Sequence, residues 1–380
     1  MPKATLIVCI GLIYSLTFPV EAQDSLHFKG QASAWVLYGP DNDLQVWAGA
    51  RYIPQLNYTI PLAEKRQIDF EMSANMSGMA GFNPFDTGHV SGEIKPYRIW
   101  ARYSTSQFEL RAGLQKINFG SASMLRPLMW FDRIDPRDPL QLTDGVWGLL
   151  GRYYFLNNAN LWFWTLIGNE KPKTWEIGGT KKWFPEFGGR FQAPVPKGEA
   201  ALSYHFRMAD IQGMDTSFAA YPEVAENRIG LDGKWDLGVG LWAEGCWINK
   251  SKNAGIYTNQ EILNGGMDYT FGIGNGLNLI FEHLVVSNDE KPFQFSNMVT
   301  FTGLSLSYPM GISDNLGIII FYDWTHNAFY NFVNWHKQFN RLSLYLMAFW
   351  NPEKYLMPQQ GESQNLFAGK GLQLLIVWNH

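Results

Sequence analysis

The sequence predicts an all-β fold, a transmembrane antiparallel β-barrel of about 18 strands, with about 16 as the alternative count. Three observations support this prediction. Polar and apolar residues alternate along many short stretches, the connections between these stretches tend to alternate between short and long, and aromatic residues make up 16% of the 380 residues. Alternation is typical of strands with two different faces. Alternating connection lengths are typical of barrels that cross a membrane.

The N-terminus predicts a secretory signal peptide over residues 1–22. Lys3 precedes an apolar run over residues 4–16, and Val20 and Ala22 occupy the small-residue positions before a cleavage site. The apolar run is too short for a membrane-spanning helix, which needs about 20 residues. We therefore expect export, with residues 23–380 forming a single outer-membrane β-barrel domain, because no linker or low-complexity tract divides them.

Composition argues against several classes of protein. Cys246 is the only cysteine after residue 22, which excludes an intramolecular disulfide and a cysteine metal cluster. The net charge of −4 gives no support to a nucleic-acid partner, which would favour a basic surface. None of the histidines lies in an HExxH motif, and no GxSxG motif occurs. We predict no enzyme activity, metal or cofactor; a rim hydrolase using Ser/His or Asp/His groups is the enzymatic alternative.

Residues 67–76 show the alternation most clearly. Five polar residues share one face, Gln67, Asp69, Glu71, Ser73 and Asn75, and five apolar residues share the other, Ile68, Phe70, Met72, Ala74 and Met76. The same reading along the chain predicts strands near residues 27–38, 43–58, 67–77, 94–104, 107–118, 147–156, 159–168, 187–194, 198–208, 226–236, 239–249, 261–272, 276–287, 297–307, 314–325, 328–336, 340–350 and 368–379. Residues 169–186 could hold one more hairpin.

The short connections would be periplasmic turns and the long ones outside loops. An even strand number then returns both termini to the periplasmic side. Because a sheet edge cannot be left unpaired in hydrocarbon, the strands must close on themselves. Tyrosine and tryptophan cluster at strand ends, as interfacial girdles require. We therefore expect the apolar faces to contact lipid of the outer membrane in a Gram-negative-type envelope; whether the barrel is a homo-oligomer stays open.

Polar faces would then line the interior. Arg98 and Arg102 share one face of a predicted strand, and Glu109 and Arg111 share one face of the next. The predicted lumen wall comprises Arg51, Arg98, Arg102, Glu109, Arg111, Arg152 and Arg207. A barrel of 16–18 strands leaves an aqueous channel unless it is plugged. Segregated charges could filter solutes; alternatively, they pair across strands and stabilise the wall.

The longest connection, residues 119–146, is the third outside loop on this count. It contains LRPLMWF, which is apolar and aromatic, followed by DRIDPRDP, which carries charges of both signs between prolines. Proline excludes a regular helix or central strand here. Long loops of this composition are functional rather than disordered. We predict that this segment folds into the barrel and narrows it, with selectivity residues Arg126, Asp132, Arg133, Asp135, Arg137 and Asp138.

The stretch LRAGLQKINFG (110–120), together with the following Asp-Pro-Arg-Asp-Pro segment, resembles the strand-plus-loop signature of the outer-membrane porin superfamily. It is similar to the alginate-export type and to related uncharacterised porins. The resemblance implies passive diffusion of small hydrophilic solutes, including anionic ones, with the inward loop as the constriction. The mixed charges of this lumen depart from the arginine-dominated lumen expected of a polyanion exporter.

Two alternatives remain for the loops. The aspartates at 132, 135 and 138 lack the DxDxDG spacing of a calcium loop, which favours salt bridges with the nearby arginines. A polysaccharide-export, capsule-assembly or glycan-binding barrel would instead present aromatic platforms to sugars, for which Trp130, Trp175, Trp183 and Tyr257 are candidates. A barrel plugged by its loops would not conduct ions, whereas an open channel would.

Overall fold

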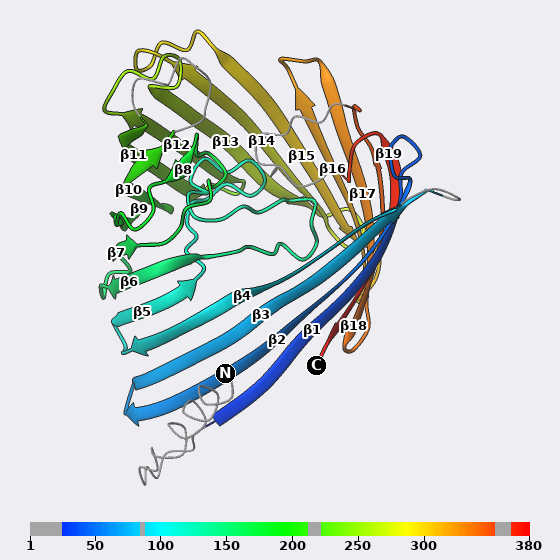
Figure 1. Ribbon diagram of the computed structural model, residues 1–380, viewed down its shortest axis with the longest axis horizontal. Coiled ribbons are helices and arrows are strands. Elements are labelled where there is room, and N and C mark those ends of the chain that lie inside the picture. The colour runs from blue at the N-terminus through cyan, green and yellow to red at the C-terminus, as the bar shows by residue number, and fades with distance from the viewer. Residues whose placement is uncertain (1–24, 84–87, 212–221, 354–365) are drawn as a thin grey trace, which may run out of the picture.

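The computed structural model describes residues 25–83, 88–211, 222–353 and 366–380, so the predicted signal peptide lies outside the described residues. Within these ranges, no helix has the length and apolar character needed to cross a membrane. The chain forms one antiparallel sheet of nineteen strands (Figure 1). Because β1 pairs with both β2 and β19, the sheet closes into a barrel.

The strand bounds follow the alternating stretches of the sequence closely. The strands are β1 (Ser25–Tyr38), β2 (Val46–Ala63), β3 (Arg66–Phe82), β4 (His89–Ser104), β5 (Phe108–Gln115), β6 (Val146–Tyr154), β7 (Asn160–Leu166), β8 (Gly179–Thr180), β9 (Glu186–Val195), β10 (Gly198–Asp210), β11 (Glu223–Asp236), β12 (Gly240–Lys250), β13 (Asn259–Phe271), β14 (Leu277–Asp289), β15 (Met298–Pro309), β16 (Asp314–Asp323), β17 (Ala328–Gln338), β18 (Leu342–Trp350) and β19 (Lys370–Asn379). β8 has only two residues and pairs with β10, while β7 pairs directly with β9. Eighteen long strands therefore form the wall. The predicted 18-strand barrel is confirmed, and the alternative count of 16 does not hold.

The two ends of the barrel differ in their connections. Short turns, such as residues 64–65, 105–107 and 196–197, join strands at one end, which we call the turn end. Longer connections, including residues 116–145 and 167–178, leave from the opposite loop end. β1 begins at the turn end, and β19 finishes there because Asn379 pairs with Gln31 of β1.

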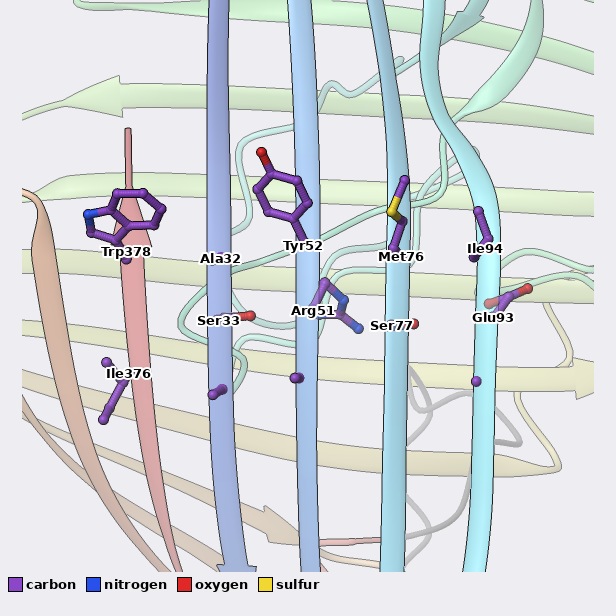
Figure 2. A pocket seen from close by; sticks show the side chains of 13 residues that line it. Ala32, Ser33, Arg51, Tyr52, Met76, Ser77, Glu93, Ile94, Ile376 and Trp378 are labelled. Carbon is purple, nitrogen blue, oxygen red and sulfur yellow. The ribbon is translucent and has the colours of Figure 1, made fainter.

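Neighbouring rows of residues point to opposite faces of the wall. In one row of the register, Ser33, Arg51, Ser77 and Glu93 lie side by side on β1 to β4 and point inward; in the adjacent row, Ala32, Tyr52, Met76 and Ile94 point outward (Figure 2). Large apolar side chains are exposed around the outward face, among them Phe28, Met72, Phe163, Leu231 and Leu372. The predicted assignment of polar residues to the interior is therefore confirmed for these strands.

The connection between β5 and β6, residues 116–145, lies inside the barrel and is named here the long inward segment. Figure 1 shows it running from β5 across the interior before the chain returns to β6. Its apolar residues, including Ile117, Leu125, Leu128 and Trp130, are almost completely buried. It is the third connection at the loop end, so the predicted inward-folded third loop is confirmed.

Residues 169–186 do not form an additional hairpin of the wall. Only β8 and the first residue of β9, Glu186, are extended there, and residues 167–178 turn inward as a second, unpredicted element, the short inward segment. Trp175 in this segment is 5% exposed. Among the described residues, the short inward segment therefore joins the long one in the interior.

Candidate functional site

Carboxylates of the inner wall hold the first half of the long inward segment. Glu282 on β14 accepts hydrogen bonds from the backbone N–H groups of Ser123, Met124 and Leu125, at 2.5, 3.0 and 2.6 Å. Glu244 on β12 accepts another from Ala122 N–H at 2.6 Å. Ionised acceptors form stronger hydrogen bonds than neutral ones. The irregular backbone inside the barrel therefore finds its partners on strands more than one hundred residues away in sequence.

Aromatic packing fixes the middle of the segment. Phe119 lies 5.4 Å from Trp130 and 5.7 Å from Trp164 of β7, measured between ring centroids. Phe131 lies 5.0 Å from the His205 ring on β10 in an edge-on arrangement. Offset and edge-on pairs of this kind are favourable beyond their buried area. The stretch LRPLMWF thus serves as the apolar anchor that the sequence predicted, packed against wall residues.

The short inward segment lies against the long one. Trp175 Nε1–H donates to the carbonyl oxygen of Arg126 at 2.8 Å, and the Thr174 hydroxyl donates to the carbonyl oxygen of Asp132 at 2.9 Å. Arg133 Nη2 in turn donates to the carbonyl oxygen of Pro172 at 3.1 Å. Each segment thus donates hydrogen bonds to the backbone of the other, and the two segments position one another.

A buried cluster of ion pairs connects the short inward segment to the barrel wall. Glu176 lies 3.5 Å from Arg207 on β10 and 2.8 Å from Arg228 on β11, and Glu226 contacts both arginines at 2.7 Å. Lys250 is 3.3 Å from Glu226. All five side chains are almost fully buried, so the paired charges compensate one another rather than contact solute. Arg207, predicted as a wall residue, belongs to this structural cluster.

A cavity of about 630 Å³ remains between the long inward segment and the wall of β1 to β4. Four of the six predicted selectivity residues line it from the segment, namely Arg133, Asp135, Arg137 and Asp138, and Arg51 lines it from β2. The other charged lining residues are Glu93, Lys95 and Asp144, and Leu366 and Phe367 also contribute to the lining. The predicted charged stretch and the predicted wall arginine are therefore brought together at one opening.

The remaining two predicted selectivity residues lie elsewhere. Asp132 is 2% exposed, and burial raises the pKa of its carboxyl despite the positive charges of Lys116, Arg98 and Arg126. Arg126 donates to the side-chain oxygen of Asn118 and to the carbonyl oxygen of Phe119, inside the segment's own turn. Neither residue lines the cavity, because the apolar anchor directs both into the packed interior.

Two of the cavity's segment residues are held rigidly. Arg137, whose side chain is 2% exposed, forms an ion pair with Asp135 at 2.5 Å and lies 5.0 Å from the Phe332 ring. Asp138 accepts a hydrogen bond from the Leu140 N–H at 2.9 Å. Burial raises the pKa of Asp138, and the nearby Asp135 charge acts in the same direction, while the Leu140 hydrogen bond and the Arg51 charge oppose it.

The other predicted wall residues form a ladder nearer the turn end. Glu109 on β5 lies 2.9 Å from Arg111, 3.7 Å from Arg102 and 3.6 Å from Arg152. Arg102 also contacts Asp69 at 2.9 Å. Their side chains stay partly exposed to the lumen, so pairing and solute contact are compatible here.

Arg98 contacts the long inward segment rather than the other charged residues of the wall. Its guanidinium donates to the carbonyl oxygen of Thr143 at 3.0 Å, to the Thr143 hydroxyl at 2.9 Å and to the carbonyl oxygen of Asp144 at 3.2 Å. It therefore binds the returning end of the long inward segment to β4. This wall arginine shapes the cavity without lining it.

Glu93 and Lys95 were not identified as site residues from the sequence. The pairing of β3 with β4 is irregular at Ser73 and Ala74, where the partners change from Arg98 to Pro96. This bulge lets Lys95 and Arg98 both point inward, although three positions separate them. Pro96 was the available signal, because proline within a strand often marks a bulge.

A larger depression of about 870 Å³ lies over β1 to β4 and β19 (Figure 2). Most of its lining residues are small or apolar, including Ala32, Ala50, Met76 and Ile376. Alanine at neighbouring outward positions leaves this shallow space between larger side chains. Its apolar character suits lipid rather than a hydrophilic solute.

The described residues contain no group of three or more His, Cys, Asp or Glu side chains arranged to hold a metal ion. His205 is fully buried between Glu186 and Trp164, at 3.1 Å from each. His326 lies 2.7 Å from Asp323 near the loop end. Both histidines are thus paired with a carboxylate, Glu186 and Asp323 respectively.

No protein-family model matches the sequence, and no curated protein sequence matches it. Solved structures do match the fold. OccK5 (OpdH) of Pseudomonas aeruginosa has a TM-score of 0.57 at 12% identity, covering 93% of this chain and 98% of that chain. OmpF of Salmonella typhi has a TM-score of 0.51 at 10% identity, covering 93% and 97% of the two chains. An anion-selective porin from Comamonas acidovorans has a TM-score of 0.50 at 10% identity, covering 94% and 100%.

At these identities the likeness establishes the fold alone. The resemblance to the alginate-export type stays a prediction. The likeness extends over at least 93% of this chain in the three matches named. The chain therefore has the fold of an outer-membrane β-barrel porin.

Proposed function

We propose that this protein is an outer-membrane channel for passive diffusion of small hydrophilic solutes, narrowed by the long inward segment. The observation that supports it most directly is the charged cavity of about 630 Å³ beside that segment, within a closed barrel. A wall of this strand number is too wide for side chains to fill. The segments reduce the interior, and the cavity beside β1 to β4 is the path that we assign to solute.

The outward face supports placement in a membrane. Phe28, Met72, Phe163, Leu231 and Leu372 are each more than half exposed and lie on β1, β3, β7, β11 and β19, which are distributed around the barrel. A contiguous apolar surface of this kind is unfavourable in water. Lipid would remove that cost, and a closed sheet leaves no unpaired backbone toward hydrocarbon.

The glycan-binding alternative receives less support. Trp130 and Trp175 are 1% and 5% exposed, so neither offers a ring face to a sugar. Trp183 is exposed and Tyr257 is partly buried. One exposed tryptophan is a weak basis for an extended glycan platform, and the diffusion channel remains the favoured function.

Planar-bilayer recording tests this function. We expect purified protein to give stepwise ohmic currents, whereas a plugged barrel would give none and would overturn the proposal. Arg133 is exposed at the cavity, so Arg133→Glu should shift the reversal potential in a salt gradient toward cation preference. Lys291→Glu makes the same charge change at an exposed position outside the cavity and serves as the matched control. Equal shifts in both variants would remove the long inward segment from the filter.

A further inference from the structure

The wall side of the cavity carries two opposite charges at one level. Arg51 on β2 pairs in register with Ser77 on β3, and Ser77 pairs with Glu93 on β4 (Figure 2). Neighbouring strands are about 4.8 Å apart, which places the Arg51 and Glu93 backbones roughly 10 Å apart across the strands. A hydroxyl group lies between a cation and an anion on the same inner surface.

The segment side also carries both signs, but some of its charges are already paired. Asp144 lies 2.7 Å from Lys95 of the wall, and Asp135 lies 2.5 Å from Arg137. In each pair, the two opposite charges lie so close together that their fields largely cancel a short distance away. Asp138 has no ion pair in the part of the chain that the structure describes, and it accepts hydrogen bonds from the backbone N–H groups of Leu140 and Leu142.

Arg51 likewise makes no ion pair with any described residue, although it lines the same cavity as Asp138. Glu93 must share Lys95, at 3.5 Å, with Asp144, and its side chain is 55% exposed. The lining thus leaves two cations, Arg51 and Arg133, and two anions, Glu93 and Asp138, available to a solute, with one of each sign on the wall and on the long inward segment. This is an arrangement for binding two charges of a solute at once.

The cavity as a whole carries no net charge. Its lining contains four cations, Arg51, Lys95, Arg133 and Arg137, and four anions, Glu93, Asp135, Asp138 and Asp144. A solute with a single charge would be attracted by half of these groups and repelled by the other half. A solute with two opposite charges could orient in the local field and gain at both ends.

We propose that the cavity favours zwitterionic solutes of the size of free amino acids over anions of the same size. The solute carboxylate would lie toward Arg51 and its ammonium group toward Asp138 or Glu93. This inference rests on the proposed channel function and deepens it by naming a class of solute. It narrows the class of small hydrophilic solutes, including anionic ones, that the resemblance implied, because the cations of the lining are matched in number by carboxylates.

Efflux from proteoliposomes at zero membrane potential and neutral pH tests the inference. Labelled alanine, lactate and glycerol have similar sizes and represent a zwitterion, an anion and an uncharged solute. We expect alanine to leave about fivefold faster than lactate, because one favourable charge contact at a solvated site changes a rate by roughly that factor. Lactate leaving as fast as alanine, or faster, overturns the inference. No glycerol efflux would instead overturn the channel function itself.

Two variants of opposite sign separate charge from damage to the fold. Arg51→Met gives the cavity a net negative charge, and Asp138→Asn gives it a net positive charge. Relative to glycerol in the same variant, lactate efflux should fall in the first and rise in the second. Alanine should lose most of its advantage in both. Shifts of lactate in the same direction would show a change of shape rather than of charge and would contradict the inference, and Lys291→Met provides the control outside the cavity.

Discussion

Replacing Glu282 by glutamine tests whether wall carboxylates position the long inward segment. Glu282 accepts three backbone hydrogen bonds, from Ser123, Met124 and Leu125. A hydrogen bond to a charged group contributes about 1.5–3 kcal/mol. Glutamine has one neutral acceptor in place of two charged oxygens, so at least one backbone N–H loses its partner and the others keep a weaker one. We expect the docked segment to lose about 3 kcal/mol.

Hydrogen exchange of the backbone amides measures this loss directly. A change of about 3 kcal/mol corresponds to a roughly 100-fold faster exchange of residues 123–125, because about 1.4 kcal/mol is a tenfold change. Glu199→Gln is the matched control, since Glu199 is a carboxylate near the turn end that bonds Gln192 at 2.6 Å. The exchange of the strand amides should stay unchanged in both variants. An increase below about threefold in Glu282→Gln would refute the assignment of Glu282 as an anchor.

Three further predictions concern the other supports of the site. Glu176→Gln should lower the free energy of unfolding, measured by urea titration in lipid vesicles, by about 3–5 kcal/mol, because the buried Arg207 and Arg228 lose one of their carboxylate partners. Glu170→Gln removes an exposed ion pair and should lower it by about 1 kcal/mol or less. Because burial raises the pKa of Asp138, this group is protonated at a higher pH than an ordinary aspartate. Reversal potentials should therefore move toward anion preference as the pH falls, beginning at a higher pH than an ordinary aspartate would give, and Asp138→Asn should lose that part of the pH dependence. A Cβ added at Gly230 would lie 2.5 Å from the Leu128 side chain of the long inward segment, so Gly230→Ala should displace that segment and change the single-channel conductance and its noise. Gly265→Ala is the control, because no heavy atom lies within 4 Å of the added carbon, and its recordings should match the wild type.

The barrel wall could be read from the sequence because its signal is local. Residues 67–76 alternate strictly, and β3 covers them with the polar residues inward, since side chains along a strand point alternately to opposite faces. The bulge at β4 interrupts this rule: Pro96 shifts the phase, and Lys95 reaches the cavity. A reading based on unbroken alternation therefore misses the residues beside an irregularity.

The path of the inward segments depends on contacts between residues that are distant in sequence, which no local sequence pattern reveals. Composition predicted that residues 119–146 fold inward, but their anchors, Glu244 and Glu282, lie on strands far along the chain. The same packing buries Asp132 and leaves Asp138 at the opening, although both belong to one charged stretch. Sequence alone determined the approximate number of strands, their two faces and the inward loop, since periodicity and composition express these features residue by residue. Only the tertiary structure determined which charges meet, because that depends on barrel closure, which brings strands distant in sequence around one cavity.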